Sequence, residues 1–146
     1  MKRALPALLC AAALGVACQT EDPTANATSI PTTPVNPTVE TFTGSVPVKG
    51  LDAKPFVIAL SGGTVTVTLT TVTPTMQMTL GVGNWTAASA SCTPFQNGGG
   101  SIVTSPSAVP QLSGTLTSGS YCLLVGDSGT GAQTTTVTYS AIVSHY

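Results

Sequence analysis

Few side chains in this sequence could do acid–base or nucleophilic chemistry, and they are scattered along the chain. The single histidine, His145, is next to the last residue, where a frayed strand end is the expected structure. Asp127 lies in the run GDSGTG, which superficially looks like a serine-nucleophile loop, but Asp, Ser and Gly together favour a hairpin turn. A hydrolase triad needs a nucleophile, a base and an orienting acid. The sequence therefore predicts no catalytic residue.

The sequence also contains no cluster of metal-ligating residues and no basic patch. Calcium needs several converging oxygens, usually with carboxylates among them, whereas Glu40, Asp52 and Asp127 are far apart in the sequence. We therefore expect no metal site and no cofactor. Charged residues make up only 6% of the 146 residues, with four Lys and Arg in all. Nucleic acid is a poor partner for such a chain, because its phosphates need a basic surface.

Cysteine carries the clearest chemical signal. Cys18 ends a short apolar run that follows Lys2 and Arg3, the pattern of a secretory signal peptide over residues 1–17. That run is too short for a transmembrane helix. The stretch LGVAC resembles a bacterial lipobox, although Gly15 stands where such signals usually have an apolar residue. The resemblance implies that Cys18 becomes the first mature residue and carries a diacylglycerol.

This anchor would place the protein in the cell envelope, with the membrane as a partner through lipid. Gln19 is not the aspartate that commonly retains such proteins at the inner membrane, which favours the outer membrane or the cell surface. Lipidation of Cys18 also leaves Cys92 and Cys122 as a single pair. In an oxidising compartment we expect these two to form a disulfide, between a strand at Cys122 and the loop region before it.

The elements that would position these residues begin after a long polar stretch. Residues 18–40 are rich in Thr and Pro, with too few apolar side chains to offset the entropy of ordering. We expect an extended, disordered linker there. The chain is thus divided into a signal peptide (1–17), which would form a signal helix, a lipid-anchored linker (18–40) and one domain (41–146).

The domain shows the period of two that is typical of half-buried strands. In the run 63–71, Val65, Val67 and Leu69 alternate with threonines, which predicts one core face and one threonine face. Turn residues separate this strand from the other candidates. These are 42–48, 54–60, 75–83, 119–126 and 134–146, with weaker ones at 101–105 and 110–116. Seven or eight short strands predict an all-β domain, an antiparallel β-sandwich of the jelly-roll or Greek-key kind.

Several short motifs resemble the bacterial pre-peptidase C-terminal family, a β-sandwich often appended to secreted peptidases. The matching segments are Phe42, Gly44 and Val46, the threonine strand 65–70, the glycine–aromatic segment SGSYCLLVGDSG, and Tyr139, Ala141 and Val143. Together they span nearly all of 41–146. The resemblance implies the sandwich fold and a secreted, non-catalytic role, although no peptidase precedes the domain in this sequence.

Trp85 is the one tryptophan, and two interpretations of it stay open. Exposed, its ring could stack on a sugar or a peptide; buried, it would cap the end of the sandwich, which is the favoured interpretation. A specific ligand is expected at the loops around Trp85 and 95–101, because a flat threonine face offers little to grip. Phe95, Gln96 and Asn97 are the other candidate contacts.

We therefore expect a non-catalytic envelope lipoprotein whose sandwich is a binding or adhesion module for protein or carbohydrate. The alternative is a purely structural envelope protein without a specific ligand; an enzyme or a hydrolase accessory is less favoured. Several aromatic rings on one exposed face would favour binding. A uniform Thr/Ser face would favour the structural role.

Overall fold

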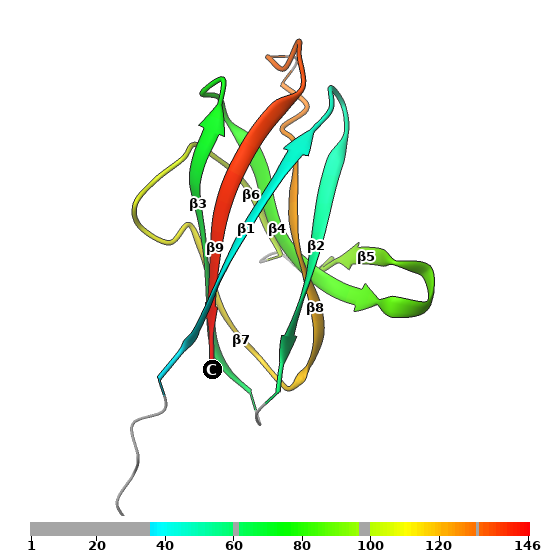
Figure 1. The fold of residues 1–146 in the computed structure, drawn as a ribbon, viewed down its shortest axis with the longest axis vertical. Coiled ribbons are helices and arrows are strands. Elements are labelled where there is room, and N and C mark those ends of the chain that lie inside the picture. Colours follow the sequence, from blue (N-terminus) through cyan, green and yellow to red (C-terminus); the bar gives the residue numbers. More distant parts are fainter. Residues whose placement is uncertain (1–35, 60–61, 97–99, 131) are drawn as a thin grey trace, which may run out of the picture. The chain divides into compact units, whose positions relative to one another are not determined.

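The computed structural model describes residues 36–59, 62–96, 100–130 and 132–146. The signal-peptide segment, Cys18 and the linker up to residue 35 lie outside these residues. The described residues form two antiparallel β-sheets that pack face to face (Figure 1). The prediction of an all-β antiparallel sandwich is confirmed. No helix in this described part is long and apolar enough to cross a membrane.

The first sheet has four strands in the order β1-β9-β3-β7. They are β1 (Thr38–Val46), β9 (Val137–His145), β3 (Gly63–Thr73) and β7 (Leu112–Leu116). β1 begins three residues before the predicted domain start at 41, because Thr38, Val39 and Glu40 already pair with the end of β9. The ladder between β3 and β9 is shifted once, between Leu69 and Thr71.

The second sheet follows the order β2-β8-β4-β5, with β6 also paired to β4. Its strands are β2 (Leu51–Ile58), β8 (Gly119–Asp127), β4 (Met78–Thr86), β5 (Ser91–Pro94) and β6 (Ser101–Thr104). β6 pairs with the first half of β4 and β5 with its last residues. A single turn of 3-10 helix, η1 (Ala87–Ser89), joins β4 to β5. The described residues therefore hold nine strands rather than seven or eight, and the unexpected one is β5.

The core lies between the inner faces of the two sheets and follows the predicted alternation. Val65, Val67 and Leu69 of β3 are buried, while their threonine neighbours point outward. The register places Thr64 and Thr66 beside serines and threonines of β7 and β9, whereas Thr68 lies opposite Ile142. The outer surface of the first sheet is thus mainly a face of hydroxyl groups, which we call the hydroxyl face.

His145 is not at a frayed strand end, so that expectation was wrong. β9 continues through His145, which pairs with Thr38 and is only 4% exposed. Its Nε2 lies 2.9 Å from Oε1 of Glu40, and its ring packs at 5.7 Å, centroid to centroid, from Phe56. The ring takes the last inward-facing position of the strand, where Phe56 and Glu40 hold it at the end of the core.

Candidate functional site

The titratable side chains of the described residues make hydrogen bonds and ion pairs that hold strands and turns together. Tyr139 donates a hydrogen bond of 3.0 Å to Asp52, which also pairs with Lys54 at 3.2 Å. Burial, together with the hydrogen bond and charge of Asp52, raises the pKa of Tyr139 well above its ordinary value. The Asp127 carboxylate accepts backbone N–H bonds from Lys49 and Gly129, as a turn aspartate does. Within the described ranges, no three His, Cys, Asp or Glu side chains are close enough to hold a metal ion.

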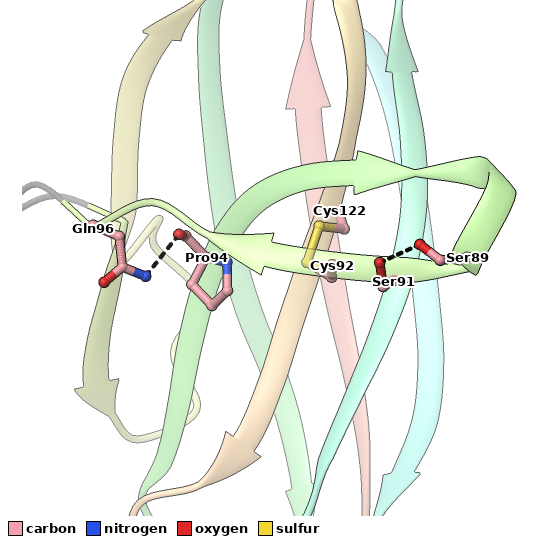
Figure 2. The surroundings of a disulfide bond; sticks show 6 residues. All are labelled: Ser89, Ser91, Cys92, Pro94, Gln96 and Cys122. Atoms are coloured by element: carbon pink, nitrogen blue, oxygen red, sulfur yellow. Dashed lines mark hydrogen bonds between the residues drawn. A yellow bond between two sulfur atoms is a disulfide. The ribbon is translucent and has the colours of Figure 1, made fainter.

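The predicted disulfide joins Cys92 to Cys122, with their Cα atoms 5.9 Å apart (Figure 2). Cys92 is in the strand β5 rather than in a loop, which corrects the sequence interpretation. Cys122 alternates with the core residues Tyr121 and Leu123 of β8, so its side chain is on the outer face of the second sheet. The bond therefore ties the β4–β5 hairpin to that outer face, and β5 contacts both β8 and β2.

Gly83 allows the backbone of β5 to approach β4 closely at the base of the hairpin. A side chain there would collide with the backbone carbonyl of Thr93 in β5, so a residue without Cβ is required. β4 pairs with β8 as far as Asn84 and with β5 from Gly83 onward. The resulting hairpin extends sideways past β8 and β2 (Figure 1).

Trp85 lies in the hairpin itself and Phe95 directly follows it. Trp85 lies opposite Cys92 in the ladder, so it is on the side of the hairpin that carries the disulfide. It is half-buried but is not among the residues of the core cluster, so it does not cap the sandwich as favoured. Phe95 does pack on the core, with its ring edge-on to Tyr121 at 6.2 Å. Phe95 is therefore a half-buried residue that packs on the core.

The remaining predicted contacts add little to a site. Gln96 is exposed, and its side-chain amide donates a hydrogen bond of 3.2 Å to the carbonyl of Pro94 (Figure 2). Asn97 lies outside the described residues. The described candidates Trp85, Phe95 and Gln96 thus lie in different surroundings, and their role as ligand contacts stays a prediction.

A different surface of the domain is hollowed in the way that ligand-binding sites are. The outer face of the second sheet contains a hollow of about 550 Å³, which we call the outer hollow. Its lining comes from all five strands of this sheet and from the β1–β2 turn. The lining residues are Lys49, Gly50, Leu51, Thr79, Gly81, Pro94, Ser101, Leu124, Gly126 and Asp127. Ligand sites typically measure about 300–1,000 Å³, so the outer hollow is large enough for one.

Cross-strand pairing explains the position of the outer hollow. Leu51, Gly126 and Thr79 are register partners across β2, β8 and β4, and Leu124 and Gly81 are partners in the next row. Opposite residues point to the same face, so these side chains share the outer surface. Two of the five are glycines, and the missing side chains leave space above the sheet.

The two glycines, Gly81 and Gly126, differ in how much space a side chain would have. A Cβ on Gly81 would lie 3.0 Å from the carbonyl oxygen of Gly100 and 3.1 Å from Cβ of Ser101, which is tight. A Cβ on Gly126 would lie 3.5 Å from its nearest neighbours, which is ordinary van der Waals contact. Packing therefore accounts for Gly81, whereas Gly126 has room for a side chain and leaves the outer hollow open.

Lys49 supplies the cation at the rim. Of the two lysines in the described residues, Lys54 is paired with Asp52, whereas the ammonium of Lys49 makes no salt bridge to the described chain. The backbone of Lys49 is left-handed, with φ of 57°, and its N–H bonds to Asp127 at 2.8 Å. The turn is thus fixed by backbone contacts, and the exposed side chain stays free to meet a ligand.

No protein-family model matches this chain, and no curated protein matches it either.

Proposed function

We propose that this protein is a non-catalytic lipoprotein of the cell envelope and that its β-sandwich is a binding module. The observation that carries the proposal is the outer hollow, a ligand-sized depression kept open at Gly126, where the fold has room for a side chain. The motifs that resemble the pre-peptidase C-terminal family also support a secreted, non-catalytic sandwich. Its ligands would be envelope proteins or carbohydrates.

The envelope location is supported by the N-terminal sequence pattern. The charged start, the short apolar run and Cys18 favour export and lipidation, and Gln19 favours the outer membrane or the cell surface. Intact-mass measurement of the membrane fraction should show loss of residues 1–17 and an added acyl mass. A Cys18→Ala variant should be released from membranes or remain unprocessed. Soluble protein cleaved at another residue would contradict the anchor.

The structural role remains the alternative, and the hydroxyl face favours it. That face is formed mainly by Thr and Ser side chains, with Val39 and Ile142 among them, which is close to the surface expected of a protein without a specific ligand. Such a protein would not need the outer hollow, however. A binding function therefore requires the outer hollow of the second sheet, whereas a structural function does not.

A Gly126→Val variant separates these functions. The valine would occupy the outer hollow without a clash at Cβ, and valine suits a strand. The matched control is Gly114→Val in β7, where a Cβ would have nothing within 4 Å; Gly114 is outside the lining of the outer hollow and borders a separate, smaller cavity of about 60 Å³. The full chain is immobilised and exposed to envelope extracts and a glycan panel. A binding module should lose its specific retention only with Gly126→Val; equal retention by both variants and the wild type would contradict the proposal.

A further inference from the structure

We propose that the outer hollow binds the C-terminal end of a partner polypeptide, with the last apolar side chain inside the hollow and the terminal carboxylate at Lys49. This inference rests on the proposed function and names its ligand class. A C-terminal residue is the place in a protein where a carboxylate and an apolar side chain share one residue. The chemistry of the lining and of the rim matches those two groups.

The lining favours an apolar group over a sugar. Leu51, Pro94 and Leu124 contribute apolar walls, and none of the lining residues is aromatic. The hydroxyl of Thr79 donates to the carbonyl of Asp127 at 3.3 Å, so it is already used within the fold. Ser101 supplies the other hydroxyl of the lining. A pyranose ring would find neither an aromatic platform nor a row of hydrogen-bonding side chains there.

The rim favours an anion. The two carboxylate oxygens of Asp127 accept the backbone N–H groups of Lys49 and Gly129, at 2.8 and 2.9 Å. The carboxylate of Asp127 is therefore held by the backbone of the turn, and the Lys49 ammonium, which makes no salt bridge to the described chain, is the one cation of the lining. A carboxylate can complete it with a charge-assisted hydrogen bond.

The size of the outer hollow fits a chain end. A volume of about 550 Å³ accommodates a few residues, not the face of a folded domain. The surrounding surface also carries exposed apolar residues: Leu51 is 64% exposed, and Val57 and Val103 on the same face are 58% and 50% exposed. These can pack against residues that precede the chain end. A bound polypeptide would thus lie across the sheet face with its terminus at the β1–β2 turn.

The test titrates the ¹⁵N-labelled full chain with four synthetic probes. The probes are acetyl-Gly-Ser-Ala-Leu as the free acid, its C-terminal amide, acetyl-Gly-Ser-Ala-Gly as the free acid, and a neutral trisaccharide. The amide signals of Gly50, Gly81 and Gly126 report on the outer hollow. The leucine acid should shift these signals and bind roughly tenfold or more tightly than its amide, because the amide cannot form the charged hydrogen bond. The glycine acid should bind as weakly as the amide.

Three variants assign the two contacts. Lys49→Asn removes the charge while tolerating the left-handed backbone, and it should reduce the affinity of the leucine acid to that of the amide. Gly126→Val should abolish binding of both. Gly114→Val, which is outside the lining of the outer hollow, should bind like the wild type. Added salt should weaken the acid more than the amide, since an exposed charge pair is screened.

Each other outcome overturns the inference in a recognisable way. Equal affinity for acid and amide, or no effect of Lys49→Asn, would refute carboxylate recognition. Trisaccharide binding at these glycines without peptide binding would refute the polypeptide class while leaving the proposed binding function in place. Shifts that depend on protein concentration alone would identify a second copy of the chain as the occupant. If none of the four probes shifts these signals, and the Gly126→Val variant retains the same components of the envelope extract as the wild type, the proposed function is refuted as well.

Discussion

Removing the Cys92–Cys122 disulfide should loosen the β4–β5 hairpin and destabilise the whole sandwich. The bond is the covalent link between β5 and β8, and β5 otherwise has ladder pairs only to the last residues of β4. We choose the double variant Cys92→Ala/Cys122→Ala, because a single substitution would leave a reactive thiol. Cys122 is fully buried, and alanine avoids placing a polar group in its position.

The magnitude follows from the length of chain that the bond closes. The two cysteines are 30 residues apart, and in the chain-entropy model a loop of this length contributes about 3.5 kcal/mol to the free energy of unfolding. A domain of this size has an unfolding entropy that converts this loss into a fall of roughly 15 °C in the melting temperature.

Two measurements check the global and the local effect. Urea unfolding followed by circular dichroism gives the loss of free energy. Hydrogen exchange should show the largest gain in exchange rate at the amides of β5, because a short edge strand opens locally once its tether is cut. Reduction of the wild-type disulfide should produce the same changes, which controls for the substitutions.

A loss below about 1 kcal/mol, with β5 exchange unchanged, would refute this reasoning. It would mean that packing beneath the hairpin holds β5 in place without the covalent bond. Trp85 is the residue to examine in that case, since it lies on the same side of the hairpin as Cys92.

Three further substitutions test separate parts of the fold. Gln133→Ala should lower the free energy of unfolding by about 1–3 kcal/mol in urea, because the buried amide donates to the Val46 carbonyl at 2.8 Å. The pKa of Tyr139 in the folded state is above its unfolded value near 10. The neutral Tyr139 hydroxyl therefore contributes fully to the free energy of unfolding below about pH 10, and this contribution is lost as the pH rises further. The urea midpoint should therefore fall in strong alkali, and less so in Tyr139→Phe. Trp85→Ala should reduce stability by less than the 3–5 kcal/mol of a fully buried ring, as calorimetry can measure.

The sequence was most informative where strands alternate strictly. The valine–threonine run of β3 places its apolar residues in the core and most of its threonines on the outer face, as its period of two predicts, although Thr68 on that outer face is buried. β5 escaped prediction because its four residues, SCTP, show no apolar alternation and contain a proline. Its pairing depends on the bend at Gly83 and on the disulfide, and both act through residues that only the folded chain brings together.

The candidate site was harder to predict, because it depends on which strands are neighbours. The alternation in β3 predicts a threonine face over the whole domain, whereas β8 has apolar residues on both faces. The run CLLV, without a polar residue, was a signal that both sides of this strand are covered. Gly81 and Gly126 become neighbours of one hollow only through the pairing of β4 with β8. Trp85 and Phe95 are close in sequence, but Phe95 packs on the core whereas Trp85 lies opposite Cys92 in the hairpin.

The open position at Gly126 gives the strongest reason to prefer a binding function over a structural one. Glycine in a strand is less stable than alanine by roughly 0.5–1 kcal/mol, and a Cβ at Gly126 would meet only ordinary van der Waals contacts. A purely structural sandwich would gain stability from Gly126→Val and lose nothing. A binding module would gain the same stability and lose its ligand. Stability and retention measured on this one variant therefore separate the two functions, because only the binding function predicts that they change in opposite directions.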